Sequence, residues 1–104
     1  MRYWDYKDRL KQQAAESGFV LGEAFNVTFG IPMPVSWSKT KRARMLGRKH
    51  QQRPDLDNLT KGLMDSLAPG DDARVWYHSA RKVWEESGCI IVENVPAVEA
   101  GVGE

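Results

Sequence analysis

The sequence predicts a single α+β domain in which two helices pack on a small mixed β-sheet. Three observations lead to this prediction. The chain has 104 residues, which is enough for one small hydrophobic core and too few for two. Apolar residues recur at helical spacing in two segments, and other segments carry alternating or continuous runs of strand-forming residues. The composition, 41% hydrophobic and 28% charged, is that of an ordinary globular protein.

The first half of the chain is expected to form one helix and one strand. A helix is predicted over residues 2–17, where apolar residues recur every three or four positions, and Gly18 provides a plausible end. Residues 24–31 alternate in the manner of a half-buried strand. Pro32 and Pro34 should end that strand, because proline cannot donate a hydrogen bond to its neighbour.

The second half is expected to add a loop, a helix and two strands. Residues 33–54 have no clear period and predict a long surface loop. Residues 58–67 carry leucines on one helical face. The strand-like stretches at residues 75–84 and 89–92 flank a short turn, which predicts a β-hairpin. Cys89, in the second stretch, is expected to be a small buried core residue.

The domain is expected to span residues 1–95, with a flexible tail over residues 96–104 that is rich in glycine and alanine. A single cysteine excludes an intrachain disulfide, and no spacing suggests zinc. No apolar run has the length of a signal sequence or a membrane span, so a cytoplasmic location is expected.

Charge is divided unevenly along the chain. Residues 24–54 carry seven Lys or Arg and no acid, whereas residues 55–104 carry ten acids and four basic residues. A basic block of this kind attracts nucleic acid without reading its sequence, and Trp37 within it could stack on a base. The alternative is a solvated loop with Trp37 packed into the core. The candidate DNA-binding residues are Trp37, Lys39, Lys41, Arg42, Arg44, Arg48, Lys49 and Arg53.

Two carboxylates follow the basic block directly. In an extended segment Asp55 and Asp57 project to one side while Leu56 anchors the segment on the other. Like charges so placed repel unless a cation lies between them, and Mg²⁺ prefers such oxygen ligands. Asp71 or Asp72, after the following helix, could complete a site that activates water for hydrolysis.

Simpler structural roles remain open for each of these residues. Asp57 could be the N-cap of the helix that begins near residue 58, and Asp71 and Asp72 could be ordinary turn residues. Lys61 could form an exposed ion pair with Asp65, or it could point toward the metal site and contact a phosphate. The clustering of the acids beside a basic segment favours the functional interpretation.

These motifs resemble those of the RusA family of Holliday-junction resolvases, many of which are encoded by prophages. The family pattern D-L-D-N-L-x-K occupies residues 55–61, an aspartate and a leucine follow at 65 and 67, and D-D-x-x-V occupies 71–75. Weaker similarity runs from about residue 3 to residue 95. The resemblance implies a RusA-like fold, with Asp55, Asp57 and Asp72 as metal-binding catalytic residues and Lys61 as an important helix lysine.

The resemblance also implies an activity and an assembly. We expect a Mg²⁺-dependent endodeoxyribonuclease that resolves four-way DNA junctions by paired symmetric nicks, acting in DNA recombination and repair. Two symmetric cuts require two active sites, and hence a homodimer. Family members usually open with a strand before the first helix, and this chain opens at the helix, so an exposed sheet edge is expected. The alternatives are a non-catalytic branched-DNA-binding remnant of a prophage resolvase and a less selective nuclease acting on flaps or forks.

Overall fold

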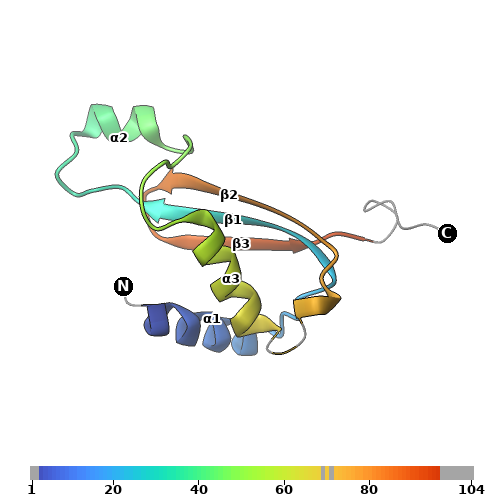
Figure 1. Cartoon of the computed structure of the whole chain (residues 1–104). Helices are drawn as coiled ribbons and strands as arrows, with labels where there is room; N and C mark the ends of the chain where they lie inside the picture. The colour runs from blue at the N-terminus through green and yellow to red at the C-terminus, as the bar shows by residue number, and fades with distance from the viewer. Residues whose placement is uncertain (1–2, 69, 71, 97–104) are drawn as a thin grey trace.

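The computed structural model describes residues 3–68, 70 and 72–96, and these form one α+β unit (Figure 1). The helices are α1 (Tyr3–Ser17), α2 (Lys39–Met45) and α3 (Leu56–Leu67), with a short 3₁₀ helix, η1 (Asp72–Arg74). The strands are β1 (Ala24–Pro32), β2 (Tyr77–Glu85) and β3 (Cys89–Asn94). The predicted fold class is thus confirmed. The predicted tail lies outside the described residues except for Pro96.

The sheet has the order β2-β1-β3, with β1 parallel to β2 and antiparallel to β3. The predicted β-hairpin is therefore wrong, because β2 and β3 follow one another in sequence but lie on opposite sides of β1. The physical reason is burial. Phe25, Val27 and Phe29 of β1 are almost completely buried, so β1 takes the central position. The outer two strands carry more charge, as is usual at the edges of a sheet, and residues 47–50 pair with part of the outer edge of β2.

One face of the sheet carries the core. Alternate residues of β1 point toward α1 and α3, which pack against each other across this face (Figure 1). The buried cluster consists of Leu10, Leu21, Phe25, Val27, Phe29 and Leu63. Gly18 ends α1 with a φ of 74°, which confirms the predicted helix end.

The opposite face of the sheet is open, and this explains the placement of Cys89. Cys89 pairs with Gly30 in the antiparallel register, so both lie on the face away from the helices. Cys89 is exposed, and the expectation that it is buried in the core is wrong. The run Cys89–Val92 reads as continuously apolar, but alternate residues of an edge strand face solvent, and Ile91 is accordingly 55% exposed.

The segment predicted as a long loop, residues 33–54, contains α2. Ser38 caps this helix by accepting a hydrogen bond from the Lys41 backbone N–H at 3.1 Å. No residue of α2 is buried. The helix therefore has no apolar face, and the missing periodicity explains why the sequence did not reveal it.

Candidate metal and nucleic-acid site

Asp55 and Asp57 lie at the beginning of α3, on either side of a hydrophobic anchor. Asp55 has extended backbone angles and occupies the N-cap position, and its side chain makes no capping hydrogen bond. Leu56 is half-buried and packs against the core. Both aspartates are exposed. The start of α3 therefore presents two carboxylates to solvent on a segment that the core holds in place.

Asp57 belongs to the first helical turn, so the interpretation of this residue as the N-cap is wrong. Its Oδ1 accepts a hydrogen bond from the Asn58 backbone N–H at 2.9 Å. This contact uses one carboxylate oxygen and holds the side chain close to its own helix. A negative charge here is also favourable, because helix N-termini carry partial positive charge. The second oxygen makes no hydrogen bond with another described residue.

Lys61 follows Asp57 by one helical turn and is exposed. Residues four apart lie on the same helical face, so Lys61 and Asp57 share a face of α3. The alternative pairing of Lys61 with Asp65 is absent: no carboxylate of the described residues lies within ion-pair distance of its ammonium group. Lys61 is thus available to an anion that approaches the start of α3.

Asp72 lies at the other end of α3 from Asp55 and Asp57. The 12 residues of α3 span about 18 Å at 1.5 Å per residue, and η1, which contains Asp72, follows its C-terminal end. In Figure 1, η1 lies where β2 begins, whereas α3 begins beside the ends of β1 and β2. The described backbone does not bring Asp72 to the other two. Its side chain, and all of Asp71, lie outside the described residues.

Lys82 is a residue of this site that the sequence did not indicate. It lies on β2 opposite Phe29, on the face that carries the core. Its ammonium group donates hydrogen bonds of 2.6 Å to the backbone carbonyls of Gln52 and Pro54. Pro54 directly precedes Asp55. Lys82 therefore ties the sheet to the segment that positions the first carboxylate; the only available signal was a lysine at an inward-facing strand position.

An aromatic cluster attaches the basic segment to the sheet. The rings of Trp37 and His50 lie 4.8 Å and 4.3 Å from that of Trp84, which is 5% exposed. The ammonium of Lys41 lies 4.2 Å above the Trp37 ring, within cation–π distance. Trp37 is half-buried by these contacts. Much of the Trp37 side chain thus packs against other residues, as the alternative expectation had it, and only the remainder is free to stack on a base.

His50 is buried beneath this cluster, and its Nδ1 has no hydrogen-bond partner among the described residues. Its backbone N–H donates to the Lys82 carbonyl at 3.0 Å. Burial lowers the pKa of His50 below its ordinary value of 6.5, and the nearby charge of Lys82 lowers it further. His50 therefore favours the neutral form and acts as a packing residue of the cluster.

The remaining basic side chains differ in whether they interact with other residues of the chain. Arg42 donates to the Pro34 carbonyl at 2.9 Å and pairs with Glu86 at 3.2 Å, so it helps to hold α2. Five others are exposed and form no ion pair with the described residues: Lys39, Arg44, Arg48, Lys49 and Arg53. Figure 1 places α2 beyond the ends of β1 and β2, at the end of the sheet where α3 begins. Exposed cations and the Asp55–Asp57 pair thus share one end of the molecule.

No group of three His, Cys, Asp or Glu side chains among the described residues is arranged to hold a metal ion. Two carboxylates nevertheless suit Mg²⁺, which commonly takes one or two and completes its shell with water and substrate phosphate. Within the described part of the chain no helix is both long and apolar enough to cross a membrane.

A family model described as endodeoxyribonuclease RusA matches residues 2–93, which is most of the chain. No curated protein matches significantly, and neither does any solved structure. The matched segment includes both carboxylates at the start of α3, Lys61, Lys82 and the entire basic segment.

Proposed function

Because the chain belongs to the endodeoxyribonuclease RusA family, we propose that it is a divalent-metal-dependent enzyme that resolves Holliday junctions by paired symmetric nicks. The observation that carries the proposal is the exposed Asp55–Asp57 pair at the start of α3, next to a basic segment. The family match supports a junction-resolving nuclease. The metal, the catalytic residues and the assembly belong to the proposal.

Asp55 and Asp57 are the proposed ligands of Mg²⁺. Bound there, the ion would supply Lewis-acid stabilisation of the phosphate and promote deprotonation of the attacking water. The chain's own contribution is to hold the two carboxylates in position. Leu56 fixes the segment in the core, and Lys82 holds the preceding carbonyls, so both carboxylates are presented without further ordering.

Lys61 and the basic segment have separate proposed roles. The ammonium of Lys61, on the same helical face as Asp57, would contact a phosphate oxygen and offset the charge that develops there. The exposed cations of residues 39–53 would hold the backbone of the arms of the junction, with Trp37 at their centre. Affinity then depends on salt, and it is independent of base sequence.

Asp72 enters the proposal through the family resemblance alone. A third acid in the same site requires η1 to approach the start of α3 when the protein is assembled on DNA. The variant Asp72→Asn separates the two versions of the site. If Asp72→Asn loses nicking as completely as Asp57→Asn does, η1 must approach the start of α3. If Asp72→Asn still nicks, the site consists of Asp55 and Asp57.

We propose a homodimer, because two symmetric nicks need two sites related by a two-fold axis. The open sheet face and the outer edge of β3 leave surface for a second copy, whereas residues 47–50 pair with part of the outer edge of β2. A prophage-encoded protein acting on bacterial DNA in the cytoplasm would fit this activity.

The experiment that tests the function compares two substitutions on one helix. Asp57→Asn should keep junction binding and reduce Mg²⁺-dependent nicking by at least about 100-fold, since a ligand and its charge are lost. Asp65→Asn makes the same charge change two turns further along α3 and should leave nicking unchanged. A gel assay of a labelled four-way junction measures both, and nicking by Asp57→Asn at the wild-type rate would overturn the proposal.

A non-catalytic junction-binding protein is the second candidate. The observation that favours it is the separation of the Asp72 backbone from the other two acids. This candidate predicts tight junction binding with no product in Mg²⁺ or Mn²⁺, for the wild type and for Asp57→Asn alike. Comparison of a four-way junction with flap, fork and linear duplex substrates separates the selective nuclease from a less selective one.

A further inference from the structure

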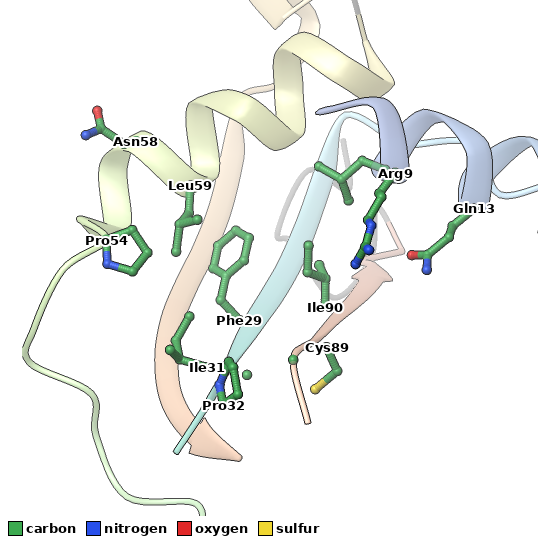
Figure 2. A pocket seen from close by; sticks show the side chains of 13 residues that line it. Arg9, Gln13, Phe29, Ile31, Pro32, Pro54, Asn58, Leu59, Cys89 and Ile90 are labelled. Carbon is green, nitrogen blue, oxygen red and sulfur yellow. The ribbon is translucent and has the colours of Figure 1, made fainter. Parts of the chain in front are cut away.

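A groove of about 880 Å³ runs between α1 and the start of α3, on the core-bearing face of the sheet (Figure 2). Phe29 and Ile31 of β1 and Ile90 of β3 form its floor. Figure 2 shows Leu59 pointing from α3 toward Phe29, which makes one wall. The groove is therefore apolar in its depth, and its volume exceeds that needed for a small ligand.

The other wall comes from α1 and carries the charge of the groove. Arg9 and Gln13 line this side, and Figure 2 shows Arg9 reaching from the helix toward Ile90. Arg9 is exposed and makes no hydrogen bond or ion pair with another described residue. Among the described side chains, no acidic residue lines the groove. An apolar floor beneath an exposed guanidinium suits a flat ligand that belongs to a polyanion.

The groove adjoins the carboxylate pair. Pro54 and Asn58, which line it, are the chain neighbours of Asp55 and Asp57. Consecutive Cα atoms are about 3.8 Å apart, so the carboxylate-bearing backbone begins one residue from the rim. Phosphates along one DNA strand are about 3.4 Å apart along the helix axis. A nucleotide at or beside the scissile phosphate is therefore within reach of the groove.

We propose that this groove receives an unpaired nucleobase from the branch point, next to the phosphate that is cut. The inference rests on the proposed function and adds a device for recognising the branch. Bases at a branch are partly unstacked, so moving one out costs less there than inside a duplex. The face of the base would lie against Ile31 and Ile90, which are half-buried, and the planar guanidinium of Arg9 would stack on its other face.

This occupant explains selectivity for structure. Every base has an apolar face, so a groove that binds that face accepts all four. The basic segment would bind any duplex arm, whereas the groove would be filled only where a base is free. Cutting would then be favoured at branches, because only there would the carboxylates and the groove be engaged by the same strand.

The test uses a four-way junction with 2-aminopurine at the position next to the branch, in Ca²⁺ so that no cutting occurs. This analogue fluoresces more strongly when it leaves the stack. The wild type should increase its fluorescence severalfold on binding and should not do so with the analogue in the middle of an arm. Nicking plays no part in this readout, so failure of the proposed nuclease activity would not be mistaken for failure of the groove.

Two matched pairs of variants localise the signal to the groove. Arg9→Met should abolish most of the increase, whereas Lys11→Met removes the same charge from the same helix outside the groove and should retain it. Gln13→Glu adds a negative charge at the rim and should reduce the increase, whereas Gln12→Glu, its neighbour on α1, should not. All four positions are exposed, so the fold is expected to survive each change.

Each outcome of this experiment either supports or overturns the proposal. A branch-specific increase that Arg9→Met and Gln13→Glu lose and their partners keep would support the proposal. Junction binding without any increase, or equal increases in all five proteins, would overturn it. A change in oligomeric state caused by Arg9→Met or Gln13→Glu, measured by analytical ultracentrifugation, would also overturn it, because it would assign the groove to a second copy of the chain.

Discussion

Lys82 and His50 determine how the segment before α3 is held against the sheet. Lys82 donates two hydrogen bonds to carbonyls in that segment, and His50 packs its ring against Trp84. The two residues also contact each other, because the His50 backbone N–H donates to the Lys82 carbonyl. The position of Asp55 thus depends on residues that lie outside the carboxylate pair.

Replacing Lys82 with methionine should destabilise this segment. Hydrogen bonds to charged groups contribute about 1.5–3 kcal/mol each, and solvent exposure of part of the side chain reduces this, so a loss of roughly 2 kcal/mol in the free energy of unfolding is expected. Amide hydrogen exchange at Leu59 should accelerate as well, since its N–H donates to the Asp55 carbonyl. Urea denaturation and exchange measurements check both effects.

The control for this substitution is Arg81→Met. Arg81 is the neighbouring strand residue, and its side chain donates one hydrogen bond to Thr28 on the open face of the sheet. Arg81→Met should lower the free energy of unfolding by less than about 1 kcal/mol and leave amide hydrogen exchange at Leu59 unchanged. Equal effects of the two substitutions would show that Lys82 has no special role in positioning.

His50 should make the stability of the fold depend on pH. Its pKa is lowered in the folded protein, chiefly by burial, so the unfolded chain binds more protons below pH 6.5. Stability is then complete above about pH 6.5 and falls as the pH decreases toward the folded pKa. The melting temperature of the wild type should therefore drop between pH 7.5 and 5.5, and that of His50→Phe should drop less. His78→Gln, at an exposed position, should behave as the wild type.

At the scale of elements, the decisive feature is the insertion of β1 between β2 and β3. Three residues connect the last two strands and pass the end of β1, where Gly88 lies against Pro32. This arrangement brings Glu85 and Cys89, which are close in sequence, to opposite sides of Gly30. A Cβ atom built on Gly30 would lie 2.5 Å from the Cys89 sulfur and 2.7 Å from Cγ of Glu85.

Gly30→Ala should therefore destabilise the protein by about 1–3 kcal/mol, the usual cost of overpacking. The clash with sulfur disappears in a Cys89→Ala background, so the same substitution should cost less there, and a double-mutant cycle in urea measures the difference. Gly47→Ala is an unsuitable control because of its positive φ. Gly88→Ala meets only ordinary contacts and provides a better comparison. If β2 and β3 instead formed a hairpin beside β1, the double-mutant cycle would show no coupling energy between Gly30 and Cys89.

At the scale of the whole molecule, charge is concentrated where the chemistry is proposed. The exposed cations of α2 and the segment after it lie at the end of the sheet where α3 presents its carboxylates (Figure 1). A net charge of +1 conceals this arrangement, because the acidic half of the chain balances the basic block. Attraction for DNA should therefore come from one end of the molecule.

Salt dependence tests this distribution. Replacing Lys39 and Arg44 with glutamine should make the slope of log K against log salt concentration less negative by about 1.8 for a four-way junction, since each phosphate contact contributes about 0.9. Both side chains are exposed on α2 and form no ion pair with the described residues. Replacing Lys11 and Arg81 instead removes the same charge elsewhere and should leave the slope unchanged. Equal slopes for both double variants would contradict a localised interface.

The sequence alone predicted the fold class, the order of the strands and of the two longer helices, and the segregation of charge, because these depend on local periodicity and composition; α2 was missed. It also predicted that Leu56 is an anchor between two exposed acids, but the extended segment on which that prediction rested is wrong beyond Asp55, because α3 begins at Leu56. The family motif at residues 55–61 and 71–75 identified the family, and the match over residues 2–93 confirmed it. The roles of Asp55, Asp57, Asp72 and Lys61 stay predictions.

Tertiary structure alone decided the rest, because it depends on which surfaces meet. Whether β2 pairs with β3 or with β1 is a competition for the central position, and the most apolar strand takes it. Alternation across that sheet then exposes Cys89 and turns Lys82 toward the Asp55 segment. The length of α3 determines how far η1 lies from the first two carboxylates. No local pattern predicts the groove beneath Arg9, because it exists only where α1, α3 and the sheet leave space between them.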